Sequence, residues 1–119
     1  MVKILSADDS AFMRKLLIKS LNKLGYTDII EVENGKDAVA KYKSDKPDLV
    51  MLDIVMKEEY GTEALKEIMA YDPNAKVIMV SSVGQEKVIE EAMASGAKAF
   101  ISKPFKEEDL QAKIKEILG

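Results

Sequence analysis

The apolar residues of this chain follow two alternating spacings, and the alternation repeats five times along the sequence. Short, nearly continuous apolar runs lie at 2–7, 29–32, 49–52, 77–80 and 99–101. After each run, apolar residues recur three or four positions apart, which is the spacing of one helix face. Several runs are apolar at every position, which is typical of parallel strands covered by helices on both sides. The pattern predicts an α/β fold of five strand–helix units, joined by right-handed connections into a doubly wound sheet.

The expected helices are bounded by residues that favour a helix start or end. Gly25 and Gly96 stand where C-terminal caps belong, Asn34–Gly35 opens the second helix, and Pro47 and Asp72–Pro73 end the second and third. The apolar stripe of the first helix consists of Met13, Leu16, Leu17, Leu21 and Leu24, and that of the fourth of Val88, Ile89, Ala92 and Met93. We expect both stripes to face the sheet.

Composition excludes several kinds of chemistry. The 119 residues suit one compact domain, so we expect a single domain over 1–119 without an output module. The formal charge is only −3 and no block of Lys or Arg occurs, which argues against nucleic-acid binding. Without His or Cys, the chain is neither a phosphohistidine carrier nor a thiolate metal protein. No stretch resembles a membrane span or signal peptide, so we expect a cytoplasmic monomer that does not associate with membranes.

Polar residues follow four of the five predicted strands. In order, these residues are Asp8, Asp9, Asp53, Ser81, Ser82 and Lys103. Because ligands of a doubly wound sheet bind at the carboxyl ends of its strands, we expect these side chains to share one edge. Each has an ordinary alternative: Asp9 or Ser10 as a helix cap, Ser81 as a turn residue, and Lys103 as a solvated charge. The joint occurrence of acids, hydroxyls and an ammonium favours a site.

The chemistry of that site is limited by its carboxylates. Three of them close together repel one another unless a cation lies among them. An oxygen-rich site without His or Cys suits Mg²⁺, or Mn²⁺, before Zn²⁺. A metal beside a carboxylate nucleophile, here Asp53, is one route to an acyl phosphate. Ser81 and Lys103 could then bind the phosphoryl oxygens.

These residues together resemble the receiver domains of two-component response regulators, and among them the stand-alone receivers of chemotaxis. The likeness extends over essentially the whole chain. Its motifs are Asp8–Asp9–Ser10 after the first strand, Asp53 after the third, Ser81 ending the fourth and Lys103–Pro104 after the fifth. The resemblance implies a flavodoxin-like (βα)5 fold with strand order 2-1-3-4-5.

The resemblance also implies a role for each site residue. Asp53 would be the phosphoacceptor, with Asp9 and Asp53 as direct ligands of Mg²⁺ and Asp8 acting mainly through metal-bound water. The backbone carbonyl of Val55 would be a further ligand. Lys103 would pair with the phosphoryl oxygens, and in the family its peptide bond to the following proline is cis.

A conformational switch is implied at Ser81 and Phe100. Ser81 would move to bind a phosphoryl oxygen, and Phe100 would rotate inward into the vacated space. This would change the surface formed by the fourth helix, fifth strand and fifth helix. The implied phosphodonor is a histidine kinase, and the implied target is a motor or adaptor protein. For Phe100, an ordinary half-buried strand aromatic remains the alternative.

Two valines occupy positions that set the lifetime of the acyl phosphate in the family. Neither Val55 nor Val83 can orient an attacking water, so we expect slow self-dephosphorylation. The chain also departs from the family pattern, with Lys57 where proline is usual, followed by Glu58 and Glu59. Ser6 replaces an aliphatic residue of the first strand, and its hydroxyl would need a hydrogen-bond partner if buried.

Three other functions remain open. A phosphorelay intermediate would pass its phosphoryl group to another histidine protein, and a degenerate receiver would bind a protein constitutively. A flavodoxin-like cofactor binder would share the fold, but acids stand where its phosphate-binding loop would be. As a receiver, the chain would not be an enzyme in the usual sense, since it would catalyse only its own phosphorylation and dephosphorylation.

Overall fold

The computed structural model describes residues 2–56, 60–82 and 85–119. Its five strands are parallel, in the order β2-β1-β3-β4-β5 that the resemblance implies. The strands are β1 (Lys3–Ala7), β2 (Asp28–Val32), β3 (Leu49–Leu52), β4 (Val77–Ser81) and β5 (Ala99–Ser102). Each agrees with its predicted apolar run to within one residue at either end. The fold-class prediction is confirmed.

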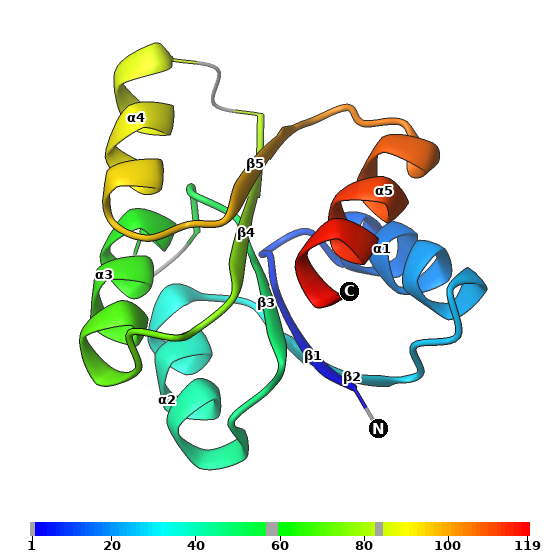
Figure 1. Cartoon of the computed structure of the whole chain (residues 1–119), viewed down its shortest axis with the longest axis horizontal. Helices are drawn as coiled ribbons and strands as arrows, with labels where there is room; N and C mark the ends of the chain where they lie inside the picture. Colours follow the sequence, from blue (N-terminus) through cyan, green and yellow to red (C-terminus); the bar gives the residue numbers. More distant parts are fainter. Residues whose placement is uncertain (1, 57–59, 83–84) are drawn as a thin grey trace.

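A helix follows each strand, and the helices divide between the two faces of the sheet (Figure 1). On one face lie α2 (Gly35–Asp45), α3 (Gly61–Tyr71) and α4 (Glu86–Ala94); on the other lie α1 (Ala11–Lys23) and α5 (Glu107–Leu118). Because both faces are covered, every residue of β3 and β4 is buried. No helix in the described ranges has the length and apolar character to cross a membrane.

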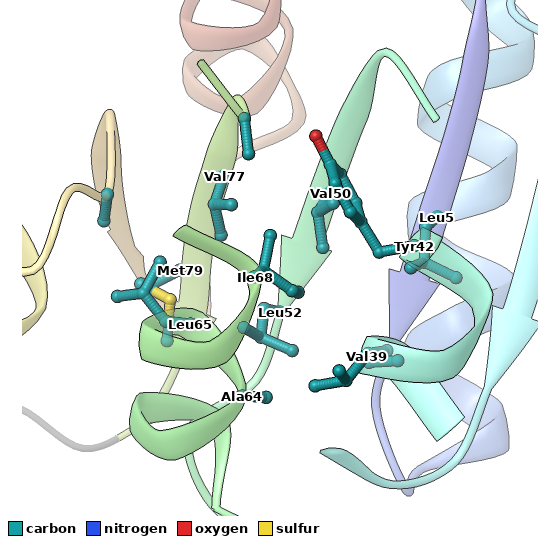
Figure 2. Packing of buried hydrophobic residues seen from close by; sticks show 14 of the residues in the cluster. Leu5, Val39, Tyr42, Val50, Leu52, Ala64, Leu65, Ile68, Val77 and Met79 are labelled. Atoms are coloured by element: carbon teal, nitrogen blue, oxygen red, sulfur yellow. The ribbon is translucent and has the colours of Figure 1, made fainter. Parts of the chain in front are cut away.

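Each face of the sheet has its own apolar core. Between the sheet and α2, α3 and α4, residues such as Leu5, Val39, Leu52 and Leu65 interdigitate from four elements, as Figure 2 shows. Between the sheet and the helices α1 and α5, the second core includes Ile4, Leu17, Leu21, Ile78, Leu110 and Ile114. Burial of apolar surface on both sides fixes the parallel strands in register.

The helix ends follow the predicted capping residues. Ser10 caps α1 by accepting a hydrogen bond from the Met13 amide, and Asn34 caps α2 in the same way. Gly25, just after α1, has a φ of 91°, and Gly96, just after α4, has a φ of 115°. Both angles lie in the region that favours glycine, so these two predictions are confirmed.

Two helical stripes were predicted too broadly. Leu16 is 38% exposed and Met93 is 42% exposed, although each was expected to face the sheet. In α1 the buried residues are Arg14, Leu17, Ser20 and Leu21, so the buried face includes an arginine one turn before Leu17. In α4 only Ala92 is fully buried. An adjacent apolar residue lies about 100° around the helix from a buried one, which is enough to leave it at the edge of the face.

Ser6 is fully buried in β1, as the apolar surroundings of that strand require. A buried hydroxyl needs a hydrogen-bond partner, but the Ser6 Oγ has none among the described residues. Ser6 lies in β1 between β2 and β3, and its neighbours in the strand, Leu5 and Ala7, are buried and apolar. Burying a hydroxyl without a hydrogen bond costs free energy, so Ser6 lowers the stability of the fold.

Candidate metal and phosphoryl site

Three carboxylates meet at the carboxyl ends of β1 and β3. Asp8 and Asp9 follow β1 and Asp53 follows β3, and these strands are neighbours in the sheet. The Asp53 amide donates a hydrogen bond to the carbonyl of Ala7, which holds the end of β3 against that of β1. One carboxylate oxygen of each acid lies within 4.8 Å of those of the other two. Asp8 and Asp53 are buried and Asp9 is exposed, so the cluster opens to solvent on one side.

Lys103 reaches this cluster from the carboxyl end of β5, an outer strand of the sheet. It follows β5, and its amide is held by the carbonyl of Ser81. Its ammonium donates to Asp8 Oδ2 at 2.6 Å and to Asp53 Oδ2 at 3.2 Å. The peptide bond between Lys103 and Pro104 is cis, as the resemblance implies. The structure thus brings Asp8, Asp9, Asp53 and Lys103 together, although they come from three separate parts of the chain.

Burial controls the electrostatics of Asp53. Desolvation raises the pKa of Asp53 above its ordinary value, and the neighbouring charge of Asp8 adds to the rise. The ammonium of Lys103 and a hydrogen bond from Ser81 oppose the rise without cancelling it. Burial alone would lower the pKa of Lys103, but its bonds to the two carboxylates outweigh that effect and raise it. The cluster holds three carboxylates and the ammonium of Lys103 bonds two of them, so negative charge remains that a cation can balance.

The chemistry of this donor set fits a hard divalent cation. All three candidate ligands are carboxylates, and oxygen donors are the ligands that Mg²⁺ and Mn²⁺ take in proteins. The exposed side of Asp9 leaves room for solvent, which suits Mg²⁺ because that ion keeps several of its waters. The acidic pocket could therefore bind a divalent metal.

The start of α3 lies against the backbone of the two residues that follow β3. The Gly61 amide, at the start of α3, donates to the carbonyl of Ile54 at 2.7 Å. A β-carbon at position 61 would lie 1.8 Å from the carbonyl oxygen of Asp53, which is far inside contact distance. Only glycine therefore allows α3 to begin this close to Asp53.

The remaining predicted residues lie around this centre. Ser81 is buried at the end of β4, close enough to hydrogen-bond Asp53, whereas Ser82 is exposed. Val55 is 52% exposed beside the site. Val83 lies outside the described residues, and so do the three loop residues that depart from the family pattern, at 57–59.

Phe100 lies farther away, on β5. Its ring is partly buried and packs against the core on the α2–α3–α4 side of the sheet. It also borders a pocket of about 590 Å³ between β5 and α5, whose lining includes Pro104 and Phe105. The residue is thus a half-buried strand aromatic at the edge of the surface predicted to bind a target.

Sequence reasoning missed one residue that supports the site. Arg14 was passed over within the first helix, yet it is buried and donates to the backbone carbonyl of Asp8 at 2.6 Å. A signal was present in the composition, because Arg14 is the only arginine among 18 basic residues. Arg is rarely buried without partners, so an Arg at helical spacing from Leu17 and Leu21 points to a specific contact.

Comparison with known proteins agrees with this geometry. The family model of the response regulator receiver domain matches residues 4–115. This chain belongs to that family. As a receiver domain it is 50% identical to the chemotaxis protein CheY of Thermotoga maritima over 103 residues, covering 87% of this chain and 86% of the relative. It is 45% identical to the chemotaxis protein CheY of Bacillus subtilis over 117 residues, covering 98% of each chain.

Solved structures show the same receiver fold. A chain of the CheX–CheY–BeF3–Mg²⁺ complex from Borrelia burgdorferi superposes with a TM-score of 0.95 at 34% identity. The match covers 99% of this receiver domain and 90% of that chain.

Proposed function

We propose that this chain is a chemotaxis response regulator of a two-component system, phosphorylated on Asp53 by a histidine kinase. The observation that carries the proposal is the convergence of Asp8, Asp9 and Asp53 with Lys103 at one sheet edge. Relatives named chemotaxis protein CheY at 45–50% identity support the pathway. The chain acts as a regulator through its binding surface, not as an enzyme with an external product.

Phosphorylation requires a nucleophile and a place for the negative charge. A carboxylate oxygen of Asp53 attacks the phosphorus of a phosphohistidine, the P–N bond breaks with its electrons going to the imidazole nitrogen, and an acyl phosphate forms. Lys103 already lies 3.2 Å from Asp53 Oδ2, so its ammonium can follow the charge onto the phosphoryl oxygens. The Ser81 hydroxyl, buried beside Asp53, is the second donor.

The metal ligands we propose are Asp9, Asp53 and the backbone carbonyl of Val55, with Asp8 acting through water. Bound Mg²⁺ would supply positive charge that offsets the charge of the phosphoryl oxygens. The fit rests on the three clustered carboxylates. The presence of Mg²⁺ and BeF3 in the complex of the Borrelia burgdorferi relative supports the same choice of ion.

The output would arise on the face formed by α4, β5 and α5. When Ser81 turns toward the phosphoryl group, Phe100 would rotate inward and alter that face for a motor or adaptor protein. The partly buried position of Phe100 supports this role, because the residue packs against one core and also lines the pocket between β5 and α5. The apolar side chain of Val55, and that of Val83 in sequence, favour a long-lived acyl phosphate.

The proposal is tested by incubation with acetyl phosphate, with and without Mg²⁺, followed by intact-mass measurement. We expect one added phosphoryl group that requires Mg²⁺ and is absent in Asp53→Asn. Circular dichroism of the variant would establish that its fold is retained. An unmodified wild-type protein with an intact fold would overturn the phosphoacceptor function.

A further inference from the structure

We propose that Arg14 is a positioning residue for the metal and phosphoryl site, acting by holding the backbone of Asp8. The inference rests on the proposed function, since it concerns the same site. Arg14 does not touch the predicted ligand atoms. Its effect would be exerted through the turn that carries Asp8 and Asp9.

The guanidinium of Arg14 joins three parts of the chain. Its Nη1 donates to the Asp8 carbonyl at 2.6 Å, and its Nε donates to Glu31 Oε1 at 3.1 Å. Its Nη2 pairs with Glu33 Oε1 at 3.5 Å. The first turn of α1, the end of β1 and the end of β2 are therefore linked by one side chain that is only 11% exposed.

Asp8 is held at every polar group. Its amide donates to Val32, Oδ1 accepts from the Ser10 amide at 2.9 Å, and Oδ2 accepts from Lys103. Arg14 supplies the bond to its carbonyl. Because Asp8 is buried, loss of that bond would leave the carbonyl without its donor, and the turn would relax toward other partners. Asp9 is attached to the same turn and would move with it.

Arg14 contributes by fixing the position of the Asp8 backbone, and not by adding positive charge to the acidic cluster. Two carboxylates, Glu31 and Glu33, already balance its positive charge, so little is left to act as a counter-ion for the acidic cluster. The planar fork of Arg can bond a carbonyl and two carboxylates at fixed angles, whereas the single ammonium of Lys cannot hold the same geometry. The use of the chain's one arginine at this buried position agrees with that requirement.

The test compares Arg14→Met and Arg14→Lys with Lys15→Met, which removes one exposed cation from the same turn of α1. The first readout is amide exchange of Ser10 in metal-free protein, which reports its bond to Asp8. We expect several-fold faster exchange in both Arg14 variants. The second is a Mg²⁺ titration followed by amide NMR signals. Outer-shell substitutions typically cost 10–100-fold in metal affinity, so the half-saturating concentration should rise by about tenfold in Arg14→Met.

In both the Ser10 exchange rate and the Mg²⁺ midpoint, Arg14→Lys should lie closer to Arg14→Met than to wild type. Lys15→Met should match wild type in both. If Arg14→Met does not fold, Arg14→Lys, which keeps the charge, decides the question in both readouts. Unchanged Ser10 exchange and an unchanged Mg²⁺ midpoint in a folded Arg14 variant would overturn the inference, even if its stability were lower. If wild type takes no phosphoryl group from acetyl phosphate, the proposed function fails, while the exchange and titration still judge the role of Arg14.

Discussion

Two aspartates lie at opposite ends of the parallel strands, and their surroundings shift their pKa values in opposite directions. Asp53, at the carboxyl edge, is buried, and desolvation raises its pKa despite the nearby ammonium of Lys103. Asp72, at the amino edge, follows α3 and accepts a hydrogen bond from the Tyr42 hydroxyl at 2.7 Å. That bond, with a second from the Asn74 amide, lowers the pKa of Asp72.

The opposite pKa shifts assign the two aspartates different roles, Asp53 in the proposed function and Asp72 in the stability of the fold. The charge of Asp53 is disfavoured in the folded protein, which leaves a reactive carboxylate ready to bind a cation or a phosphoryl group. The charge of Asp72 is favoured, and its cluster ties α2 to the end of α3 through Tyr42, whose ring also meets Tyr71 edge to face. In Figure 2 the ring of Tyr42 lies at the margin of the core with its hydroxyl pointing outward.

The largest expected effect concerns the backbone at the carboxyl edge. Gly61→Ala would place a β-carbon 1.8 Å from the Asp53 carbonyl oxygen, and the three nearest atoms are all backbone atoms of Asp53 and Ile54, which cannot move aside as a flexible side chain could. We expect a loss of about 3 kcal/mol in the free energy of unfolding, as for overpacked sites. Urea denaturation measures it.

Gly25→Ala is the matched control at the opposite edge. Its φ of 91° disfavours alanine, but no atom lies within 4 Å of the added carbon. We expect a loss of about 1 kcal/mol from the backbone conformation alone. Equal losses in the two variants would contradict the close contact at Gly61.

The next effect concerns the amino edge. Tyr42→Phe removes the hydroxyl that donates to Asp72 while keeping the ring in the core. We expect a loss of about 1 kcal/mol in the free energy of unfolding, the usual size for one hydrogen bond. Phosphorylation by acetyl phosphate should be unchanged, because the site lies at the other edge. A large loss of phosphorylation in a folded variant would show that the edges are coupled.

Two buried serines, one without and one with a hydrogen-bond partner in the described part of the chain, allow the same kind of comparison for uncharged groups. Ser6→Ala removes a hydroxyl without a partner among the described residues, so we expect a gain of up to about 1 kcal/mol in the free energy of unfolding. Ser20→Ala removes a hydroxyl that donates to Glu107 at 3.1 Å, and we expect a loss of similar size. Thermal denaturation compares the two. The same sign in both would mean that packing, and not pairing, decides their contribution.

The smallest expected effect is a pair of pH dependences with opposite signs. Asp53 has a raised pKa in the folded state, so its stabilising contribution is present below the ordinary value of 3.8 and is lost as pH rises through the folded pKa. Asp72 has a lowered pKa, so its contribution is present above 3.8 and is lost as pH falls through the folded pKa.

At neutral pH, Asp53→Asn should therefore raise the denaturation midpoint and Asp72→Asn should lower it. Both differences should shrink in acid, as denaturation curves over a pH series would measure. A lower midpoint for Asp53→Asn at neutral pH would mean that Lys103 outweighs the burial of Asp53.

Much of the fold could be predicted because it depends on local periodicity. The fully apolar runs at β3 and β4 indicated parallel strands, and Gly25 and Gly96 marked helix ends. The positions of Asp8, Asp53 and Lys103 after their strands followed from the same pattern, since parallel strands end at one edge. The strand order and the cis bond before Pro104 came from the family resemblance, not from periodicity.

Other features could not be predicted because they depend on which elements meet. The sequence alone determined the kinds of residue available to the site, a set of acids, hydroxyls and one lysine in a chain without His or Cys. Only the tertiary structure decided that Asp8 would be buried and Asp9 exposed, that Arg14 would bond the Asp8 carbonyl, and that Ser6 would lack a partner among the described residues. Periodicity specifies which face of an element is apolar, but distances between side chains arise only when those faces pack together.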